Sequence, residues 1–187
     1  MPMFLIVWLG FFVLLLLYGI TIYNRLVVSK NRVEAAWSQI DVQLKRRSDL
    51  IPNLVELVKD YMGYEQETLK AVIDARASAV AAREGGRAGA VAAEGLLGVA
   101  LGRLFALAED YPDLKANETL GELQSQLEAT EAAIAGARQH YNNAVMQLNT
   151  MVESFPSNLV AGPFNFAKAV FFEIPEADRK PVKVDLL

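Results

Sequence analysis

The sequence contains no cysteine and a single histidine among its 187 residues. The absence of cysteine excludes disulfides, thiolate zinc sites and cysteine nucleophiles. The histidine, His140, has no other candidate ligand at metal-binding spacing, so we interpret it as structural or solvent-facing. No Gly-rich phosphate loop follows a predicted strand, and no nucleophile elbow occurs.

The chain also lacks a strong excess of charge of either sign, since the formal net charge is only −4. This charge is too weak and of the wrong sign for a nucleic-acid binder. An acidic cluster, Glu109, Asp110 and Asp113, could serve acid–base chemistry, but a polar loop at the end of a helix explains it more simply. The sequence therefore predicts a protein that is not an enzyme and that holds no metal or cofactor.

Proline is rare, with seven residues in the whole chain, and most of them follow residue 111. The middle of the chain is instead rich in Ala, Leu, Glu, Gln and Arg, which are strong helix formers. These features predict an all-α protein.

The segment 3–23 contains no charged residue. About 20 apolar residues, each rising ~1.5 Å, cross the ~30 Å hydrocarbon core of a bilayer. A cleaved signal peptide is the alternative, but it requires a basic start, a shorter apolar run and a small-residue cleavage site. None of these is present, so we predict a transmembrane anchor over residues 1–23.

Basic residues flank the anchor on one side only. Arg25, Lys30 and Arg32 follow it, whereas nothing basic except the amino terminus precedes it. The positive-inside tendency therefore predicts that the protein is in the inner cell membrane with its N-terminus outside and residues 24–187 in the cytoplasm.

Apolar residues at alternating steps of three and four predict an antiparallel bundle of about four long helices over residues 24–157. The first and fourth helices should match in length, and Asn117 is the predicted N-cap of the fourth.

Nothing breaks the chain between Ile20 and Val33, so the anchor and first helix can be continuous. The third helix is rich in small residues and is either buried in the bundle or a contact between subunits. The four predicted helices span about 24–62, 65–83, 90–110 and 117–154.

The tail, residues 158–187, differs from the bundle because it carries four phenylalanines within nine residues. Such density predicts a segment docked on the bundle or on a neighbouring subunit. Its end, "VKVDLL" (182–187), alternates like a strand, which must find an edge or stay extended.

The stretch "LKRRSDLIPNL" (44–54) places three basic residues and a proline inside the first bundle helix. Pro52 cannot donate to the carbonyl of Ser48 and is expected to kink the helix. Leu44 and Ile51 are seven residues apart, so the apolar stripe resumes in phase across the cluster and Arg47 falls within the core layer between them.

A charge in that layer needs a partner. If Tyr23 lies opposite Phe155 in the antiparallel pair, paired residue numbers add to about 178, because both helices rise ~1.5 Å per residue. Arg47 then faces Glu131, and we predict that the two form a polar layer that fixes helix register. Lys45 and Arg46 are left as candidate contacts for an acidic partner.

Two further arginines, Arg76 and Arg138, follow alanine in similar contexts near apolar stripes. A buried arginine must be paired. We therefore expect both to form salt bridges inside the bundle.

Several blocks are distinctive in combination: "YNRLV" after the anchor, "AAWSQIDVQLKRRSDLIPNLVELVKDY", "YPDLKANETLGELQSQLEATE" and "ARQHYNNAV". In this order, and over nearly the whole chain, they resemble the LemA family of bacterial membrane proteins. The resemblance implies one N-terminal span followed by a helical bundle, and it supplies no enzymatic activity. The stretch 83–103 looks like the variable part. The motif positions are Trp37, Ile40, Asp41, Arg46, Arg47, Asp49, Pro52, Arg76, Tyr111, Pro112, Leu114, Arg138, Tyr141 and Asn142.

Two functions fit these features. The first is a non-enzymatic scaffold, anchored in the inner membrane, that self-assembles and organises partner proteins or the membrane itself. The second is a monomeric membrane adaptor or regulator of a protease, transporter or signalling protein. The expected partners are the lipid bilayer, further copies of the chain and an unidentified protein.

Overall fold

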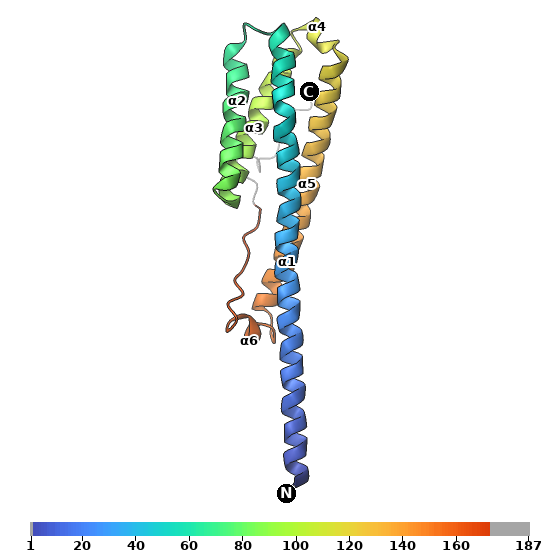
Figure 1. Ribbon diagram of the computed structural model, residues 1–187, viewed down its shortest axis with the longest axis vertical. Helices are drawn as coiled ribbons and strands as arrows, with labels where there is room; N and C mark the ends of the chain where they lie inside the picture. Colours follow the sequence, from blue (N-terminus) through green and yellow to red (C-terminus); the bar gives the residue numbers. More distant parts are fainter. Residues whose placement is uncertain (1, 173–187) are drawn as a thin grey trace, which may run out of the picture. The chain divides into compact units, whose positions relative to one another are not determined.

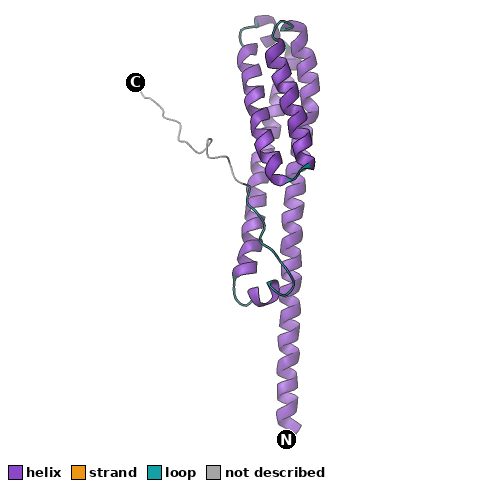
Figure 2. Cartoon of the chain, turned by 90° about the vertical axis from the view of Figure 1, so that its left-hand side faces the viewer, coloured by secondary structure: helices purple, strands orange, loops and turns teal. Residues whose placement is uncertain are grey.

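The computed structural model describes residues 2–172, which form helices and contain no strand (Figures 1 and 2). The predicted all-α class is therefore confirmed. The predicted strand at 182–187 lies outside the described residues. The helices are α1 (Pro2–Tyr61), α2 (Gln66–Glu84), α3 (Arg87–Ala108), α4 (Pro112–Lys115), α5 (Glu118–Glu153) and α6 (Asn158–Ala161).

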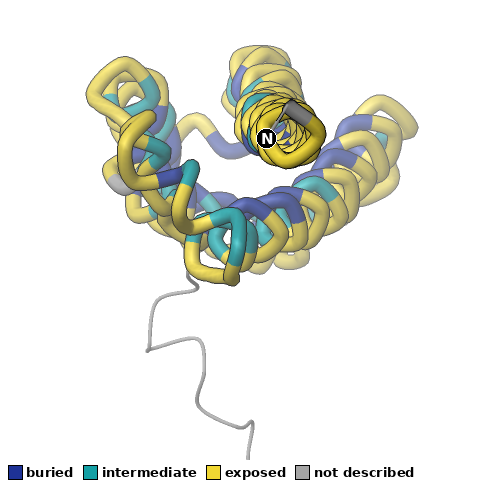
Figure 3. The backbone as a smooth tube through the Cα atoms, turned by 90° about the horizontal axis from the view of Figure 1, so that it is seen from below, coloured by how far each residue is buried: buried dark blue, intermediate teal, exposed yellow. Residues whose placement is uncertain are grey.

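The predicted anchor and the predicted first bundle helix are parts of one helix, α1, of 60 residues. Its residues 3–18 are all exposed, and the N-terminal end of the tube is accordingly yellow in Figure 3. An α-helix satisfies its own backbone hydrogen bonds, which is what a segment in hydrocarbon requires. This part of α1 has the length and composition of a membrane span.

The described chain divides into two compact units. Of the described residues, the first unit contains 2–39 and 137–171, and the second contains 40–136 and Phe172. Helices α1 and α5 contribute residues to both units, whereas α2, α3 and α4 belong to the second.

In the first unit, the N-terminal part of α1 packs against the C-terminal part of α5 and the segment that follows it. Ile22, Leu26 and Ala161 form a buried apolar cluster there. The ring of Trp37 on α1 meets the ring of buried Tyr141 on α5 edge-on, with centroids 5.5 Å apart.

The tail folds back along α5 within this unit. The amide of Asn149 bonds the backbone of Ala169 twice, donating to its carbonyl at 2.9 Å and accepting from its N–H at 2.8 Å. The hydroxyl of Tyr141 donates to the Val170 carbonyl at 2.8 Å. The described part of the tail is therefore docked on helices of its own chain.

In the second unit, α2 and α3 lie beside the remaining parts of α1 and α5 (Figure 1). The apolar stripe of α1 is buried there among leucines of α3 and α5. These core residues include Ile51, Leu54, Val58, Leu97, Leu104, Leu120, Leu123 and Leu127.

Three contacts between α1 and α5 confirm the predicted register of this pair. Trp37 meets Tyr141, Arg47 meets Glu131, and Asn117 donates to the Tyr61 hydroxyl at 3.1 Å. The residue numbers of each pair add to 178. Equal rise along the two helices, together with the assumed pairing of Tyr23 with Phe155, therefore predicted which residues face one another.

Capping hydrogen bonds and the backbone preferences of glycine and proline explain where several helices begin. Asn117 caps α5 as predicted, because its side-chain oxygen accepts from the backbone N–H of Thr119 at 2.9 Å. Gly86 precedes α3 with a φ of 117°, a conformation that glycine adopts without strain. The one-turn helices α4 and α6 were not predicted. Pro112 begins α4, which is a favourable position for proline.

Candidate functional site

A charged layer crosses the second unit at Arg47. The Arg47 guanidinium lies 2.6 Å from the carboxylate of Glu131 on α5, measured from Nη1 to Oε2. The same Nη1 atom lies 3.9 Å from Oε2 of Glu94 on α3. A methyl group placed on Gly98 of α3 would lie 3.4 Å from Nη2 of Arg47. Arg47 is thus held between α3 and α5.

The two carboxylates differ in their exposure to solvent. The Arg47 and Glu94 side chains are 7 % and 1 % exposed, whereas that of Glu131 is 52 % exposed. The prediction of a buried Arg47–Glu131 pair was therefore wrong in one respect, because the deeply buried carboxylate belongs to Glu94. That residue is the only charge between Arg87 and Arg103, and this isolation was the signal that sequence reasoning missed.

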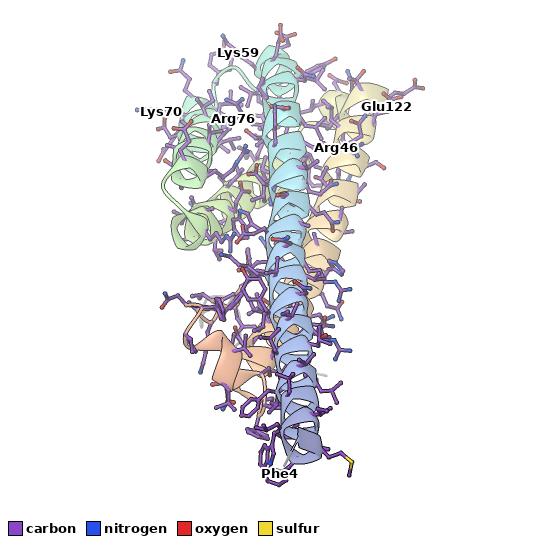
Figure 4. The ribbon with its side chains drawn as sticks, turned by 60° about the horizontal axis from the view of Figure 1, so that its bottom comes forward. Phe4, Arg46, Lys59, Lys70, Arg76 and Glu122 are labelled. Atoms are coloured by element: carbon purple, nitrogen blue, oxygen red, sulfur yellow. The ribbon has the colours of Figure 1, made fainter. Side chains whose placement is uncertain are left out.

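Arg76 of α2 contacts the point where Pro52 interrupts the hydrogen bonds of α1. Its Nε donates to the carbonyl of Ser48 at 2.8 Å, and Figure 4 shows the side chain between α2 and α1. This is the carbonyl that a residue other than proline at position 52 would bond through its own N–H. Sequence analysis predicted a salt bridge for Arg76, whereas the structure assigns it to this carbonyl. Helix α1 continues through Pro52.

Lys45 is exposed, and its role as a contact for an acidic partner stays a prediction. Its Nζ lies 2.7 Å from Oδ2 of Asp49 one turn away, within hydrogen-bond distance. This hydrogen bond holds the pKa of the Asp49 carboxyl below its ordinary value. Arg46 is exposed and extends from α1 (Figure 4). Its role as a contact for an acidic partner stays a prediction.

Two further polar contacts join helices or their ends elsewhere in this unit. Tyr111 donates to a carboxylate oxygen of Glu65 at 3.2 Å. Burial, and then this hydrogen bond, raises the pKa of Tyr111 above its ordinary value. Arg83 lies 3.0 Å from the Asp41 carboxylate.

The structure also places the remaining candidate residues. His140 is exposed, and Glu109 pairs with Lys115. Among residues 2–172, no three His, Cys, Asp or Glu side chains gather as metal ligands would. Other motif positions serve packing, since Ile40 and Leu114 are fully buried. Arg138 and Asn142 are half-buried on α5.

The fold and these contacts define a membrane-associated helical-bundle protein in which most motif residues hold helices together. Residues 36–186 match the family model described as "LemA family", and the chain belongs to that family. This finding confirms the resemblance seen in the motifs.

The chain is similar to three proteins in particular. It is 28 % identical to magnetosome protein MamQ 2 of Paramagnetospirillum magneticum, over 86 % of this chain and 68 % of that protein. It is 26 % identical to MamQ of Magnetospirillum gryphiswaldense, with the same coverage of both chains. It is 24 % identical to protein LemA of Metamycoplasma hominis, over 85 % of this chain and 72 % of that protein.

Proposed function

We propose that this protein is a non-enzymatic scaffold, anchored in the inner membrane, that self-assembles through the outer face of α3. One observation carries the proposal: Leu96 and Val99 of α3 are 66 % and 56 % exposed, although other apolar residues of the same helix fill the core. A helix that is apolar on all sides is normally buried on all sides. We therefore expect the outer face of α3 to be buried against another molecule.

A second copy of the chain fits this face. A methyl group placed on Gly95 or Gly102 would have no atom within 4 Å, so the backbone of another helix can approach there. Leu96 and Val99 stand beside these glycines and offer side chains to fill the matching gaps on an identical face. A face with both features is self-complementary, as a two-fold symmetric interface requires. Insertion of α3 into lipid is disfavoured because it would carry buried Glu94 away from Arg47.

Replacing Leu96 with glutamate is expected to reduce the mass of the assembly, because the substitution places a charge inside the interface. Light scattering of the full chain at micromolar concentration, with the detergent mass subtracted, measures this effect. Ser125→Glu is the matched control, since it adds the same charge to an exposed position on α5.

Two results would contradict the scaffold proposal. One is a wild-type protein that is monomeric in this measurement. The other is an equal loss of mass in the Leu96→Glu and Ser125→Glu variants. A monomer would favour the alternative function, an adaptor that presents its bundle to a membrane protease, transporter or signalling protein.

We also propose that the bundle faces the cytoplasm, because Arg25, Lys30 and Arg32 follow the apolar segment. A tag attached after residue 187 should survive protease added to intact cells and should be digested once the membrane is permeabilised. Digestion in intact cells would reverse the proposed orientation.

A further inference from the structure

An open groove of about 610 Å³ lies in the first unit, between one face of α1 and the C-terminal end of α5. Its two ends differ in polarity. Tyr18, Ile22 and Pro156 line one end, whereas Arg25, Arg32, Ser29 and Gln147 line the other. Both ends also carry residues of the other kind, Thr21 and Ser157 at the first end and Val28 at the second, so the difference in polarity rests on the two arginines.

The groove crosses the border between hydrocarbon and headgroups if residues 3–23 span the bilayer. Arg25 is the first charged residue of the sequence, so the apolar end begins within the charge-free segment. From Tyr18 to Arg32 the helix advances 14 residues, or ~21 Å. Tyr18 lies ~7.5 Å before Tyr23 and Arg32 lies ~13.5 Å beyond it, so the groove extends from the edge of the hydrocarbon through the headgroup layer, which is ~5–7 Å deep on each side.

Aromatic residues beside the groove mark the same depth. The ring of Tyr23 contacts Phe164 and Phe166 edge-on, with centroids 4.9 and 5.7 Å apart. Phe155, next to Pro156 in the groove wall, is 78 % exposed, and Leu159 is also exposed. Tyrosine, which joins an apolar ring to a polar hydroxyl, gathers at the membrane–water interface. These side chains suit contact with lipid at the border of the hydrocarbon.

The polar end of the groove carries two arginines without an acidic partner in the described chain. Neither Arg25 nor Arg32 has a carboxylate within ion-pair distance among residues 2–172. They are seven residues apart, two helical turns or ~10.5 Å, and so they lie on one side of α1. The guanidinium group matches the oxygens of a phosphate with two parallel hydrogen bonds.

We propose that this groove binds one anionic phospholipid of the surrounding leaflet. The phosphate lies between Arg25 and Arg32, and an acyl chain follows α1 toward Tyr18. The side chains of Ser29 and Gln147 are placed to bond the glycerol or headgroup. The polar-to-apolar direction of the groove is the one that a lipid already has in the leaflet, so binding needs no reorientation. This inference rests on the membrane anchor but not on self-assembly through α3.

The test uses the delipidated full chain in a neutral detergent, titrated with phosphatidylglycerol or with phosphatidylcholine. Native mass spectrometry counts the bound lipids, and the melting temperature reports their effect. We expect one tightly held phosphatidylglycerol, weaker binding of phosphatidylcholine and a rise in melting temperature. Arg25→Gln and Arg32→Gln should each lower the affinity for phosphatidylglycerol by at least about tenfold, because each removes a charge-assisted hydrogen bond.

Lys30→Gln is the matched control. Lys30 lies between the two arginines in sequence, carries the same charge and is exposed as they are, but it does not line the groove. Its loss should change the affinity by less than about threefold, because a charge outside the groove makes no direct hydrogen bond to the bound phosphate and acts only through screened, long-range attraction. An equal loss in all three variants would overturn the proposal in favour of diffuse attraction. Equal binding of both lipids would also overturn it.

Soluble probes separate a lipid site from a phosphate site. Inorganic phosphate and glycerophosphoglycerol, which lack acyl chains, should not displace phosphatidylglycerol at millimolar concentration. Full displacement by either one would show that the groove recognises a free phosphate compound and would overturn the assignment to lipid. Unchanged circular dichroism of the lipid-free variants excludes misfolding as the cause of lost binding.

Discussion

Replacing Arg47 with methionine is expected to lower the free energy of unfolding by about 3–5 kcal/mol, the cost of breaking a buried ion pair. Methionine preserves much of the side-chain volume, so the loss reports the missing charge. The substitution removes the cation beside Glu94, whose side chain is 1 % exposed. Urea unfolding of the full chain in mild detergent, followed by circular dichroism, measures the effect.

The exposure of the two carboxylates predicts unequal effects in the control variants. Glu131→Gln should cost no more than about 1 kcal/mol, because a half-exposed ion pair is weakened by solvent. Adding Glu94→Gln to Arg47→Met should recover at least half of the loss, since a buried amide costs less than a buried carboxylate. If Glu131→Gln is as damaging as Arg47→Met, the buried member of the layer has been assigned wrongly.

The same geometry predicts that exchanging the charges of Arg47 and Glu131 will not restore the full stability. Arg47→Glu should destabilise the second unit, and Glu131→Arg would restore the ion pair with α5. The new carboxylate at position 47 would then lie beside Glu94 on α3, and like charges in a buried site repel. The exchange should therefore rescue only part of the loss, whereas the register prediction alone implied that most would return.

Replacing Arg76 with methionine is expected to cost about 1–3 kcal/mol of unfolding free energy, because it leaves the buried carbonyl of Ser48 without a donor. The cost should fall to less than half of that value in a Pro52→Ala background. Alanine at position 52 supplies a backbone N–H to the same carbonyl, so Arg76 is no longer needed there. A double-mutant cycle with the four chains measures the coupling.

Arg83 provides the matched control for this cycle. It lies on the same helix, but its partner Asp41 is half-exposed. Arg83→Met should cost about 1 kcal/mol or less and should be indifferent to the residue at position 52. A cost of Arg76→Met that is the same with proline and with alanine would show that the Ser48 carbonyl is not what Arg76 stabilises.

The helices and the pairing of α1 with α5 could be predicted from the sequence, because the spacing of apolar residues shows which face of each helix is buried. The positions of Leu44 and Ile51 placed Arg47 in the core, and equal rise along α1 and α5 placed Glu131 opposite. Contacts across other elements were harder to predict. Nothing in the spacing of α2 or α3 shows which of their faces meets α1, so neither Glu94 nor the carbonyl bonded by Arg76 was predicted.

The groove could not be predicted from the sequence either. Arg25 and Arg32 were interpreted through their charge alone, as determinants of orientation. Their place in the groove depends on α5 ending near the membrane-proximal part of α1 and on the turn that carries Pro156. The aromatic tail was predicted to dock, but the hydrogen bonds of Asn149 to Ala169 depend on a reversal of chain direction that composition does not encode.

The pairing of α1 with α5 also sets an order of events during synthesis. The nearest of the register contacts, Tyr61 with Asn117, joins residues 56 positions apart. At ~5–20 residues per second, the ribosome needs about 3–11 s to make that intervening chain. Helices α2 and α3 are adjacent in sequence and can pair within this interval. The apolar stripe of α1 meanwhile has no α5 to cover it, so the newly made protein passes through a stage in which this long helix is exposed beside the membrane.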